Sequence, residues 1–272
     1  MPKVKANDLE MFYEVYGPEG APKLVYIGGA RSDLRSASMN TNPLVEHFRM
    51  MAFDQRGQGQ TDKPDIPYSM AMQADDAAGL MDATGFSPAI VMGVSFGGMV
   101  AQELVLRHPE KVLFLVLCCS SSGGAGGRSA DFRAILTNPD RSQDENIRAY
   151  LYIQDRRRTP DYMASHPEEI QRLVDQYKRG PDPLGSARLY EARQSHNTYD
   201  RLGQIRVPTL VMGGIYDGQA PPENQERLAA AIAGAKLYMF EGGHQFLNQD
   251  REAAYRTIIN HLKSYLGQRT AA

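Results

Sequence analysis

The stretch VMGVSFGGMV, residues 91–100, places one serine between glycines, directly after one apolar run and directly before another. Serine is a weak former of both strands and helices, and neighbouring glycines cost backbone entropy on folding. A G-x-S-x-G sequence at a sharp strand-to-helix turn presents the serine oxygen at the top of the turn. The sequence therefore predicts a strand that ends at Val94, a strained turn at Ser95 and a helix over 97–109.

The two flanking glycines fit the same interpretation. At Gly93 and Gly97 we expect the strand and the helix to pass too close for a β-carbon. The positive end of the helix dipole would then lie beside the serine oxygen, where it favours a developing negative charge. The alternative is a chance G-x-S-x-G in a glycine-rich loop, but the apolar runs on both sides favour the functional interpretation.

Length and composition are those of an ordinary globular protein. The chain has 272 residues, of which 42% are hydrophobic and 23% charged, enough for a single domain with a large core or for a core with an insertion. The formal net charge is −2. A charge this close to neutral does not indicate nucleic acid or an anionic membrane surface as a partner.

Several other expectations follow from what the sequence lacks. Cys118 and Cys119 are adjacent, which disfavours a disulfide between them and suits a reducing compartment. Residues 1–17 lack the apolar core of a signal peptide, and no run of about 18 apolar residues occurs. We therefore expect a cytoplasmic protein without a membrane span. There is no H-E-x-x-H, paired C-x-x-C or phosphate-binding loop motif, so no metal or cofactor is expected.

Apolar, strand-like runs alternate with helical segments along most of the chain. Such runs are 22–29, 89–94 and 112–119, and a helix is expected over 69–85, with Ser69 as its N-cap and Gly85 at its end. The alternation resumes at Pro208 and closes with a helix over about 249–266. This order predicts an α/β fold with a mostly parallel sheet covered on both faces.

The middle of the chain, 123–203, departs from the alternation. It follows the flexible sequence SSSGGAGGRS and lacks apolar strand-like runs. We interpret 123–203 as a helical cap over the carboxyl edge of the sheet, and 1–122 with 204–272 as the core. The basic run 156–158 is expected to be a solvated face of this cap.

A serine nucleophile needs a base, and the base needs an acid to orient it. Among the six histidines, His244 stands out because it follows the last apolar strand in a glycine-bearing loop. Asp217 follows the preceding strand, so both loops should lie at the carboxyl edge beside Ser95. The order serine, aspartate, histidine is the one expected for this arrangement. A structural loop histidine and a turn-forming aspartate are the alternatives.

An oxyanion site would complete the arrangement. One donor should be the backbone N–H of Phe96, the residue after the serine, and the other should lie in the loop after the first buried strand. That loop is Gly28-Gly29-Ala30, and the Ala30 N–H is the best-placed candidate. The glycines alone would be explained by a tight turn. Arg31, next to this loop, is either a surface charge or a partner for a substrate carboxylate.

Four motifs resemble those of the α/β-hydrolase superfamily over essentially the whole chain. They are GVSFGG, FDQRGQGQTDKP, GGIYDGQAP and EGGHQF, and the passage HNTYDRLGQIRVPTLVMGG is similar to the return from cap to core in the capped esterase and enol-lactonase branch. The resemblance implies an eight-stranded, mostly parallel sheet with a helical cap after the sixth strand. It also implies a Ser95 nucleophile, an Asp217 acid and a His244 base.

The sequence departs from that family at two positions. Gly28-Gly29 stands where the oxyanion loop usually has His-Gly, and Gln58 stands where the family often has histidine. The serine at position 95 disfavours haloalkane dehalogenase and epoxide hydrolase, for which an aspartate would be expected there.

The resulting functional hypothesis is hydrolysis of a small-molecule carboxylic ester or lactone, for example an enol-lactone or an acyl-homoserine lactone, through an acyl-enzyme. One alternative is carbon–carbon bond hydrolysis or cofactor-free perhydrolysis by the same three residues. A second alternative, from a different class, is a non-catalytic ligand receptor with the same fold.

Overall fold

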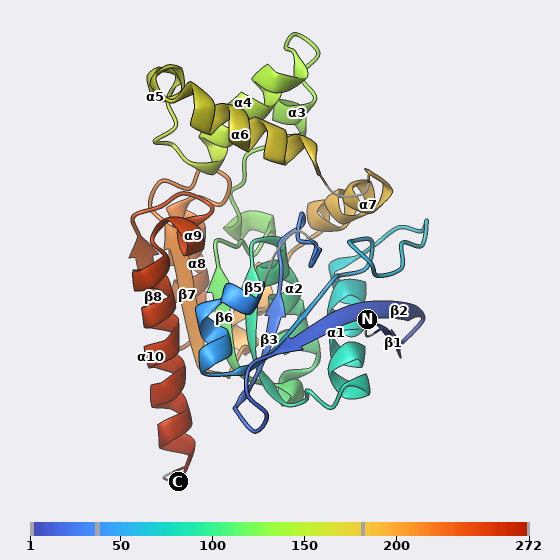
Figure 1. Cartoon of the computed structure of the whole chain (residues 1–272). Helices are drawn as coiled ribbons and strands as arrows, with labels where there is room; N and C mark the ends of the chain where they lie inside the picture. Colours follow the sequence, from blue (N-terminus) through green and yellow to red (C-terminus); the bar gives the residue numbers. More distant parts are fainter. Residues whose placement is uncertain (1–2, 36–38, 181–182, 271–272) are drawn as a thin grey trace.

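The computed structural model describes residues 3–35, 39–180 and 183–270, and at its centre is one eight-stranded sheet (Figure 1). The strands run in the order β1-β2-β4-β3-β5-β6-β7-β8; β1 with β2 and β2 with β4 are antiparallel, and every other neighbouring pair is parallel. Their bounds are β1 Lys3–Ala6, β2 Leu9–Tyr16, β3 Lys23–Ile27, β4 Arg49–Phe53, β5 Ala89–Val94, β6 Val112–Cys118, β7 Thr209–Gly214 and β8 Lys236–Phe240. The predicted α/β fold with an eight-stranded, mostly parallel sheet is confirmed.

Both faces of the sheet are covered by helices, because the central strands are apolar on both sides. Successive strand residues point to opposite faces: Ile90 packs with the helices of one face and Val91 with those of the other. The first face carries α9, α10 and the short 3-10 helix η2, and the second carries α1, α2 and α8. These helices are η2 Pro43–Glu46, α1 Met70–Ala83, α2 Phe96–Arg107, α8 Pro222–Ala231, α9 Phe246–Gln249 and α10 Arg251–Thr270.

Local sequence signals explain where helix α1 begins and ends. The Ser69 side chain accepts a hydrogen bond from the Met72 N–H at 3.1 Å, as expected of an N-cap. Just beyond its end, Gly85 has φ +67°, a left-handed conformation that glycine adopts without strain. The predicted helix is confirmed. The last helix, expected over about 249–266, is divided into α9 and α10 and extends further toward the C-terminus.

Between β6 and β7 the chain forms a second, helical layer, the cap, which lies above the sheet edge where the parallel strands end (Figure 1). Its helices are α3 Phe132–Leu136, α4 Gln143–Gln154, α5 Pro160–Ser165, α6 Pro167–Lys178 and α7 Pro183–Gln194. Ile147 and Leu151 of α4 pack against Ile170 and Val174 of α6 in a small apolar core. The cap therefore has an interior of its own, besides its contacts with the sheet edge.

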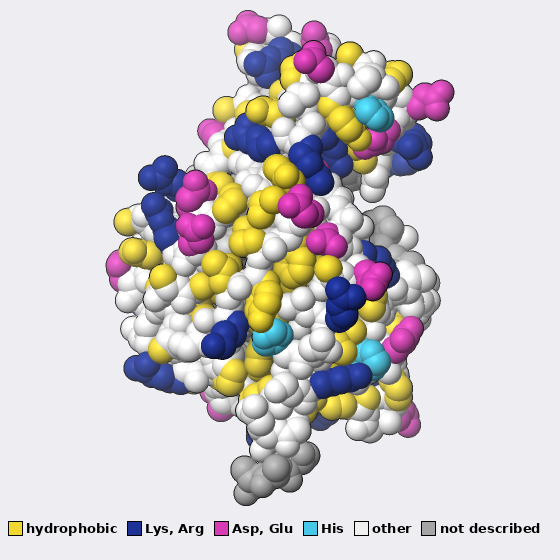
Figure 2. Space-filling model, turned by 90° about the vertical axis from the view of Figure 1, so that its left-hand side faces the viewer, with side chains coloured by type: hydrophobic (Ala, Val, Ile, Leu, Met, Phe, Trp, Pro, Cys, Tyr) yellow, Lys and Arg dark blue, Asp and Glu magenta, His cyan; other side chains and the backbone are white. Residues whose placement is uncertain are grey.

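Charged and hydrophobic side chains are interspersed over the face drawn in Figure 2. That distribution agrees with the near-neutral net charge of −2. Cys118 and Cys119, at the end of β6, are buried and free, and burial raises the pKa of both thiols. Among the described residues, no helix is long and apolar enough to cross a membrane.

A buried ion pair joins the loop after β4 to helix α1. Arg56 bonds to Asp76 from Nε at 2.7 Å and from Nη2 at 2.8 Å, and both side chains are only 3% exposed. The Nη2 atom also donates to Asp8, whose side chain is 65% exposed, at 2.9 Å. The pair fixes the loop that carries Gln55 and Gln58, which contact the candidate site.

We predict that Asp76→Ala lowers the free energy of unfolding by about 3–5 kcal/mol, because it leaves the Arg56 guanidinium buried without its main partner. Asp8→Ala removes an exposed partner of the same arginine and should cost about 1 kcal/mol or less. Urea unfolding followed by circular dichroism measures both. Equal losses in the two variants would contradict the proposed importance of burial.

Candidate active site

Ser95 occupies the turn between β5 and α2 in a conformation that few residues adopt. Its φ is 56° and its ψ is −116°, outside the allowed regions for residues with a β-carbon. Backbone contacts on both sides fix this turn: the Ser95 N–H donates to the Cys118 carbonyl at 2.8 Å, and the Ser120 hydroxyl donates to the Ser95 carbonyl at 2.9 Å. The predicted strained turn is confirmed.

The flanking glycines are required by two different neighbours. A β-carbon on Gly93 would lie 2.3 Å from the Gly97 carbonyl oxygen, so β5 and the start of α2 are as close as the sequence predicts. A β-carbon on Gly97 would instead lie 2.1 Å from the Ile27 oxygen and 2.4 Å from the Gly28 oxygen. The close neighbour of Gly97 is therefore the end of β3, and the expectation that β5 excludes its β-carbon is corrected.

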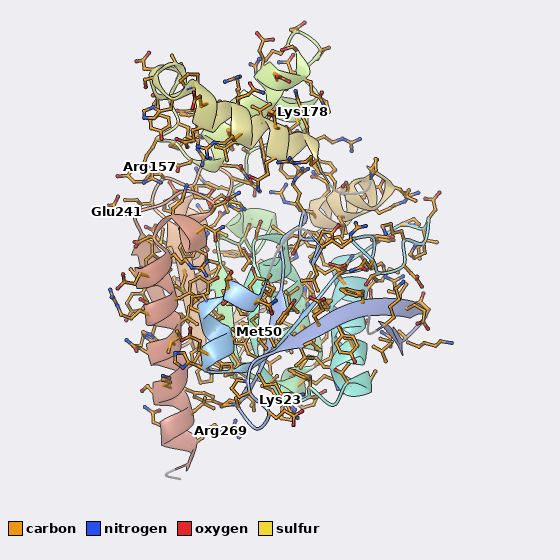
Figure 3. The ribbon with its side chains drawn as sticks, in the orientation of Figure 1. Lys23, Met50, Arg157, Lys178, Glu241 and Arg269 are labelled. Carbon is orange, nitrogen blue, oxygen red and sulfur yellow. The ribbon has the colours of Figure 1, made fainter. Side chains whose placement is uncertain are left out.

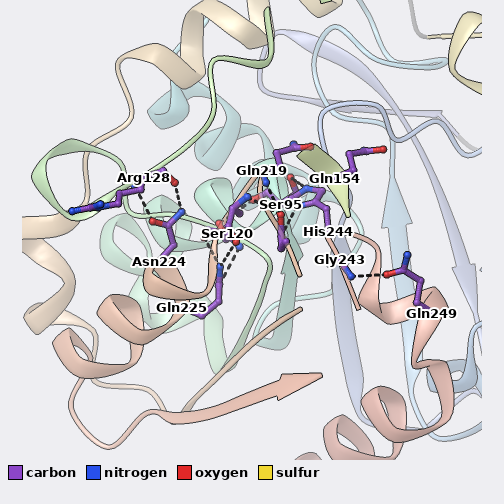
Figure 4. A network of polar contacts seen from close by, with 12 residues as sticks. Ser95, Ser120, Arg128, Gln154, Gln219, Asn224, Gln225, Gly243, His244 and Gln249 are labelled. Carbon is purple, nitrogen blue, oxygen red and sulfur yellow. Dashed lines mark hydrogen bonds and ion pairs between the residues drawn. The ribbon is translucent and has the colours of Figure 1, made fainter. Parts of the chain in front are cut away.

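Three loops bring Ser95, His244 and Asp217 into one hydrogen-bonded row. Ser95 and His244 lie next to each other in Figure 4. His244 Nε2 lies 2.9 Å from Ser95 Oγ, and His244 Nδ1 lies 2.7 Å from Asp217 Oδ2. The first distance falls inside the range of about 2.6–3.2 Å that proton transfer between such groups requires. The predicted proximity of these residues is confirmed by both distances.

The Asp217 carboxylate is oriented by its own loop. Its Oδ1 atom accepts the backbone N–H groups of Gln219 and Ala220, each at 2.8 Å, while Oδ2 faces His244. The side chain of Asp217 is 0% exposed and that of His244 is 9% exposed. A buried carboxylate in this position would stabilise a positively charged imidazole and fix its Nδ1 as the protonated nitrogen.

The loop after β3 lies beside Ser95, where an oxyanion site is expected. A β-carbon built on Gly29 would be 3.6 Å from the Ser95 β-carbon. Gln55 Nε2 donates to the Gly28 carbonyl at 2.8 Å, and Gln58 Nε2 donates to the Gly29 carbonyl at 3.2 Å. Two glutamine amides therefore hold this loop, one of them at the position where the sequence departs from the family pattern.

The backbone N–H groups of Phe96 and Ala30 have no protein acceptor among the described residues. Phe96 N–H is at the first residue of α2, where helix N–H groups lack partners within the helix. Both groups are therefore available to an external acceptor.

Arg31 joins the loop after β3 to the cap. Its Nη2 donates to the Tyr177 carbonyl at 2.8 Å, and its guanidinium carbon lies 3.9 Å from the centre of the Tyr177 ring. Tyr177 belongs to α6, so these contacts connect the loop after β3 to the cap. Sequence reasoning could not supply this partner because it lies 146 positions away.

The other five histidines have different surroundings. Nε2 of His108 lies 2.7 Å from Asp75, and His166 stacks on Tyr162. His196 is buried in the cap, where desolvation lowers its pKa to about 4 and its Nε2 meets the Ser121 carbonyl at 3.1 Å. Over the described parts of the chain, no group of three or more His, Cys, Asp or Glu residues is placed to hold a metal ion.

The fold and this row of side chains define the class of protein. A profile described as the alpha/beta hydrolase fold matches residues 28–250, and the chain belongs to that family of hydrolases.

Three known proteins are similar to this chain over nearly its full length. The chain is 26% identical to the proline iminopeptidase PfmaB of Pestalotiopsis fici, over 96% of this chain and 98% of that protein. It is 27% identical to the putative carbamate hydrolase RutD of Variovorax paradoxus, over 93% and 96%. The solved enol-lactonase from Burkholderia xenovorans LB400 superimposes with a TM-score of 0.79 at 27% identity, over 96% and 100%. These names support a hydrolase in general and not one particular substrate.

We predict that Gly97→Ala destabilises the protein by about 1–3 kcal/mol, because its β-carbon must displace the Ile27 and Gly28 carbonyls. Any activity should fall as well, since the same displacement moves the loop after β3 away from its place beside Ser95. Gly203→Ala is the control, because a β-carbon there meets nothing within 4 Å. Thermal unfolding of both variants tests this, and a Gly97→Ala protein as stable as the control would refute it.

Proposed function

We propose that the protein is a serine hydrolase of carboxylic esters or lactones, with Ser95 as nucleophile, His244 as base and Asp217 as the acid that orients it. The observation that carries this proposal is the continuous row of hydrogen bonds, 2.9 Å from Ser95 Oγ to His244 Nε2 and 2.7 Å from His244 Nδ1 to Asp217. A serine hydroxyl attacks an acyl carbon at neutral pH only when a base of this kind removes its proton.

In the first half of the proposed reaction, Ser95 Oγ attacks the substrate carbonyl carbon while His244 Nε2 takes the hydroxyl proton. The carbonyl oxygen becomes negatively charged and accepts the N–H groups of Phe96 and Ala30, which stabilise charge that develops only in the transition state. His244 then returns the proton to the leaving alcohol, and the Ser95 acyl ester remains. In a lactone the alcohol stays attached to the acyl group.

In the second half, a water molecule takes the place of the alcohol. His244 removes a proton from the water, the resulting hydroxide attacks the acyl carbon, and the Ser95 oxygen leaves with the proton that His244 returns. The products are a carboxylic acid and free Ser95, and a lactone gives a single hydroxy acid. No cofactor or metal enters the proposed reaction.

An aromatic pair of the cap contacts the loop that carries Asp217, and aromatic side chains suit an acyl chain or a small ring. Tyr150 of α4 is 4% exposed, lies 5.2 Å from Tyr177 between ring centres, and donates from its hydroxyl to Gln219 at 2.8 Å. Gln219 is two residues from Asp217. The similarity to an enol-lactonase along the full chain supports placing esters and lactones ahead of the other acyl compounds.

Two other hypotheses are compatible with the same three residues. Carbon–carbon bond hydrolysis or perhydrolysis would pass through the same Ser95 and His244, and analysis of the products separates these reactions from ester hydrolysis. A non-catalytic receptor would retain its ligand and turn it over slowly. Carbamates and prolyl peptides, the substrates that the names of relatives suggest, belong in the same test.

We predict that the wild type hydrolyses at least one member of a panel of p-nitrophenyl esters with two to twelve carbons, simple lactones and acyl-homoserine lactones. Ser95→Ala should lower kcat/KM by about a thousandfold or more, because only binding and the oxyanion donors remain. Rates are measured on both purified proteins with the same substrates. Equal rates in the two proteins would contradict the nucleophilic role of Ser95.

We further predict that Asp217→Asn lowers kcat by about a thousandfold to ten-thousandfold with little change in KM. The Oδ1 atom would still accept the N–H groups of Gln219 and Ala220, so the new amide NH₂ would face His244 Nδ1. The imidazole would then carry its proton on Nε2 and could not accept one from Ser95. Steady-state kinetics test this; a loss confined to KM would argue against the assigned role.

A further inference from the structure

We propose that residues 153–156, where cap helix α4 ends, act together with Gln249 as a positioning element that sets the place of His244 relative to Asp217. This inference rests on the proposed function, because it assigns residues that act through the catalytic row. The cap would then serve the chemistry directly, besides covering the substrate.

Backbone hydrogen bonds join both catalytic loops to this one short segment. The His244 N–H donates to the Gln154 carbonyl at 2.6 Å, and the Gly218 N–H, next to Asp217, donates to the Ile153 carbonyl at 2.9 Å. In the other direction, the Arg156 N–H donates to the Tyr216 carbonyl at 2.9 Å. The carbonyl groups at the end of α4 lack partners within the helix, so the catalytic loops satisfy groups that the helix leaves free.

The approach is close enough to require glycine in each loop. A β-carbon on Gly243 would lie 2.3 Å from the Gln154 oxygen and 2.7 Å from the Asp155 β-carbon. A β-carbon on Gly218 would lie 2.3 Å from Arg156 Nε and 2.8 Å from the Ile153 oxygen. Loose contact between cap and core would leave room for side chains at both positions.

A side-chain bridge reinforces the histidine loop. Gln249 Nε2 donates to Asp155 Oδ2 at 2.8 Å, and Gln249 Oε1 accepts the Gly243 N–H at 2.7 Å (Figure 4). The Gln249 side chain therefore connects Asp155 of the cap to Gly243, the residue before His244. Arg157 donates to both oxygens of Asp155; although burial raises the pKa of Asp155, these hydrogen bonds hold it below its usual value.

The basic run 156–158 lies at the same junction. Arg156 and Arg157 are exposed, as expected of a solvated cap face, and they also contact the loop that precedes Asp217. The Arg157 guanidinium lies 4.9 Å from the centre of the Tyr216 ring. Figure 3 shows Arg157 and Glu241 together where the cap meets the end of β8. Arg157 faces the Tyr216 ring because its guanidinium is held by the Asp155 carboxylate.

The hydrogen bonds between the end of α4 and the loop of His244 also restrict how the cap can move. The His244 N–H is held by Gln154 of the cap, and the Gly243 N–H is held by Gln249, which in turn donates to Asp155 of the cap. A rigid outward movement of α4 would break the His244–Gln154 and Gln249–Asp155 bonds and remove the support of His244. We infer that this end of the cap stays attached during turnover.

The test uses the full-length protein with Gln249→Met, which preserves side-chain length and removes both hydrogen bonds. Gln249→Glu is the second variant, because it places a carboxylate against Asp155; adding Asp155→Asn restores a donor opposite it. The control is Gln171→Ala: Gln171 of α6 accepts a hydrogen bond from Arg148 of α4 at 3.0 Å, on an exposed face. The measurements are kcat and KM on the best ester or lactone, the melting temperature, and the downfield proton resonance of His244 Nδ1–H.

At temperatures where the variants are folded, Gln249→Met and Gln249→Glu should each lower kcat at least tenfold and leave KM within twofold of the wild type. Both should shift or broaden the His244 Nδ1–H resonance. Asp155→Asn should return most of the kcat lost in Gln249→Glu, and Gln171→Ala should match the wild type. A purely structural bridge would lower the melting temperature and leave kcat and the resonance unchanged, which would overturn the inference. If Gln249→Met does not fold, the comparison of Gln249→Glu with and without Asp155→Asn decides.

The His244 Nδ1–H resonance tests the positioning element independently of the proposed function, because it can be recorded whether or not the protein hydrolyses a substrate. If the wild type hydrolyses nothing in the panel, the proposed ester and lactone activity fails. A changed resonance in the Gln249 variants would then still support the positioning element, and an unchanged one would overturn it. If the wild type is active and the variants match it in kcat and resonance, only the positioning element fails.

Discussion

The backbone packing around Ser95 is the constraint on which the rest of the structure depends. β5, the start of α2 and the end of β3 meet at distances that exclude a β-carbon on Gly93 and on Gly97. That packing forces Ser95 to φ 56° and brings the loop after β3 beside it. The proposed nucleophile and the proposed oxyanion site therefore depend on one steric condition. The strain costs on the order of 1–3 kcal/mol, which the surrounding sheet must offset.

Parallel strands explain why two distant loops complete the site. β7 and β8 end at the same sheet edge as β5, so Asp217 and His244 reach Ser95 although 149 positions separate the serine from the histidine. The sheet fixes only where each loop begins. The final placement comes from hydrogen bonds made outside the sheet: backbone N–H groups orient Asp217, and the end of α4 receives the loop of His244.

The fold class and the three central residues were predictable because each depends on a local pattern. A glycine-flanked serine between a strand and a helix, and polar residues just after buried strands, are visible in a few consecutive residues. The partners of Arg31, Arg156 and Gln249 were not predictable. Their contacts depend on how the cap is oriented over the core, which no short stretch encodes. The same holds for Gly97, whose neighbour Ile27 lies on a strand far away in the sequence.

The glutamines that hold the loop after β3 give the site a further property. Gln55 and Gln58 are each 1% exposed and donate through neutral amides, groups that neither gain nor lose a proton between acidic and alkaline conditions. An imidazole in either position would change its charge near neutrality. The side chains that hold the loop after β3 therefore keep the same charge over a wide range of pH, so a change of pH leaves these two hydrogen bonds in place.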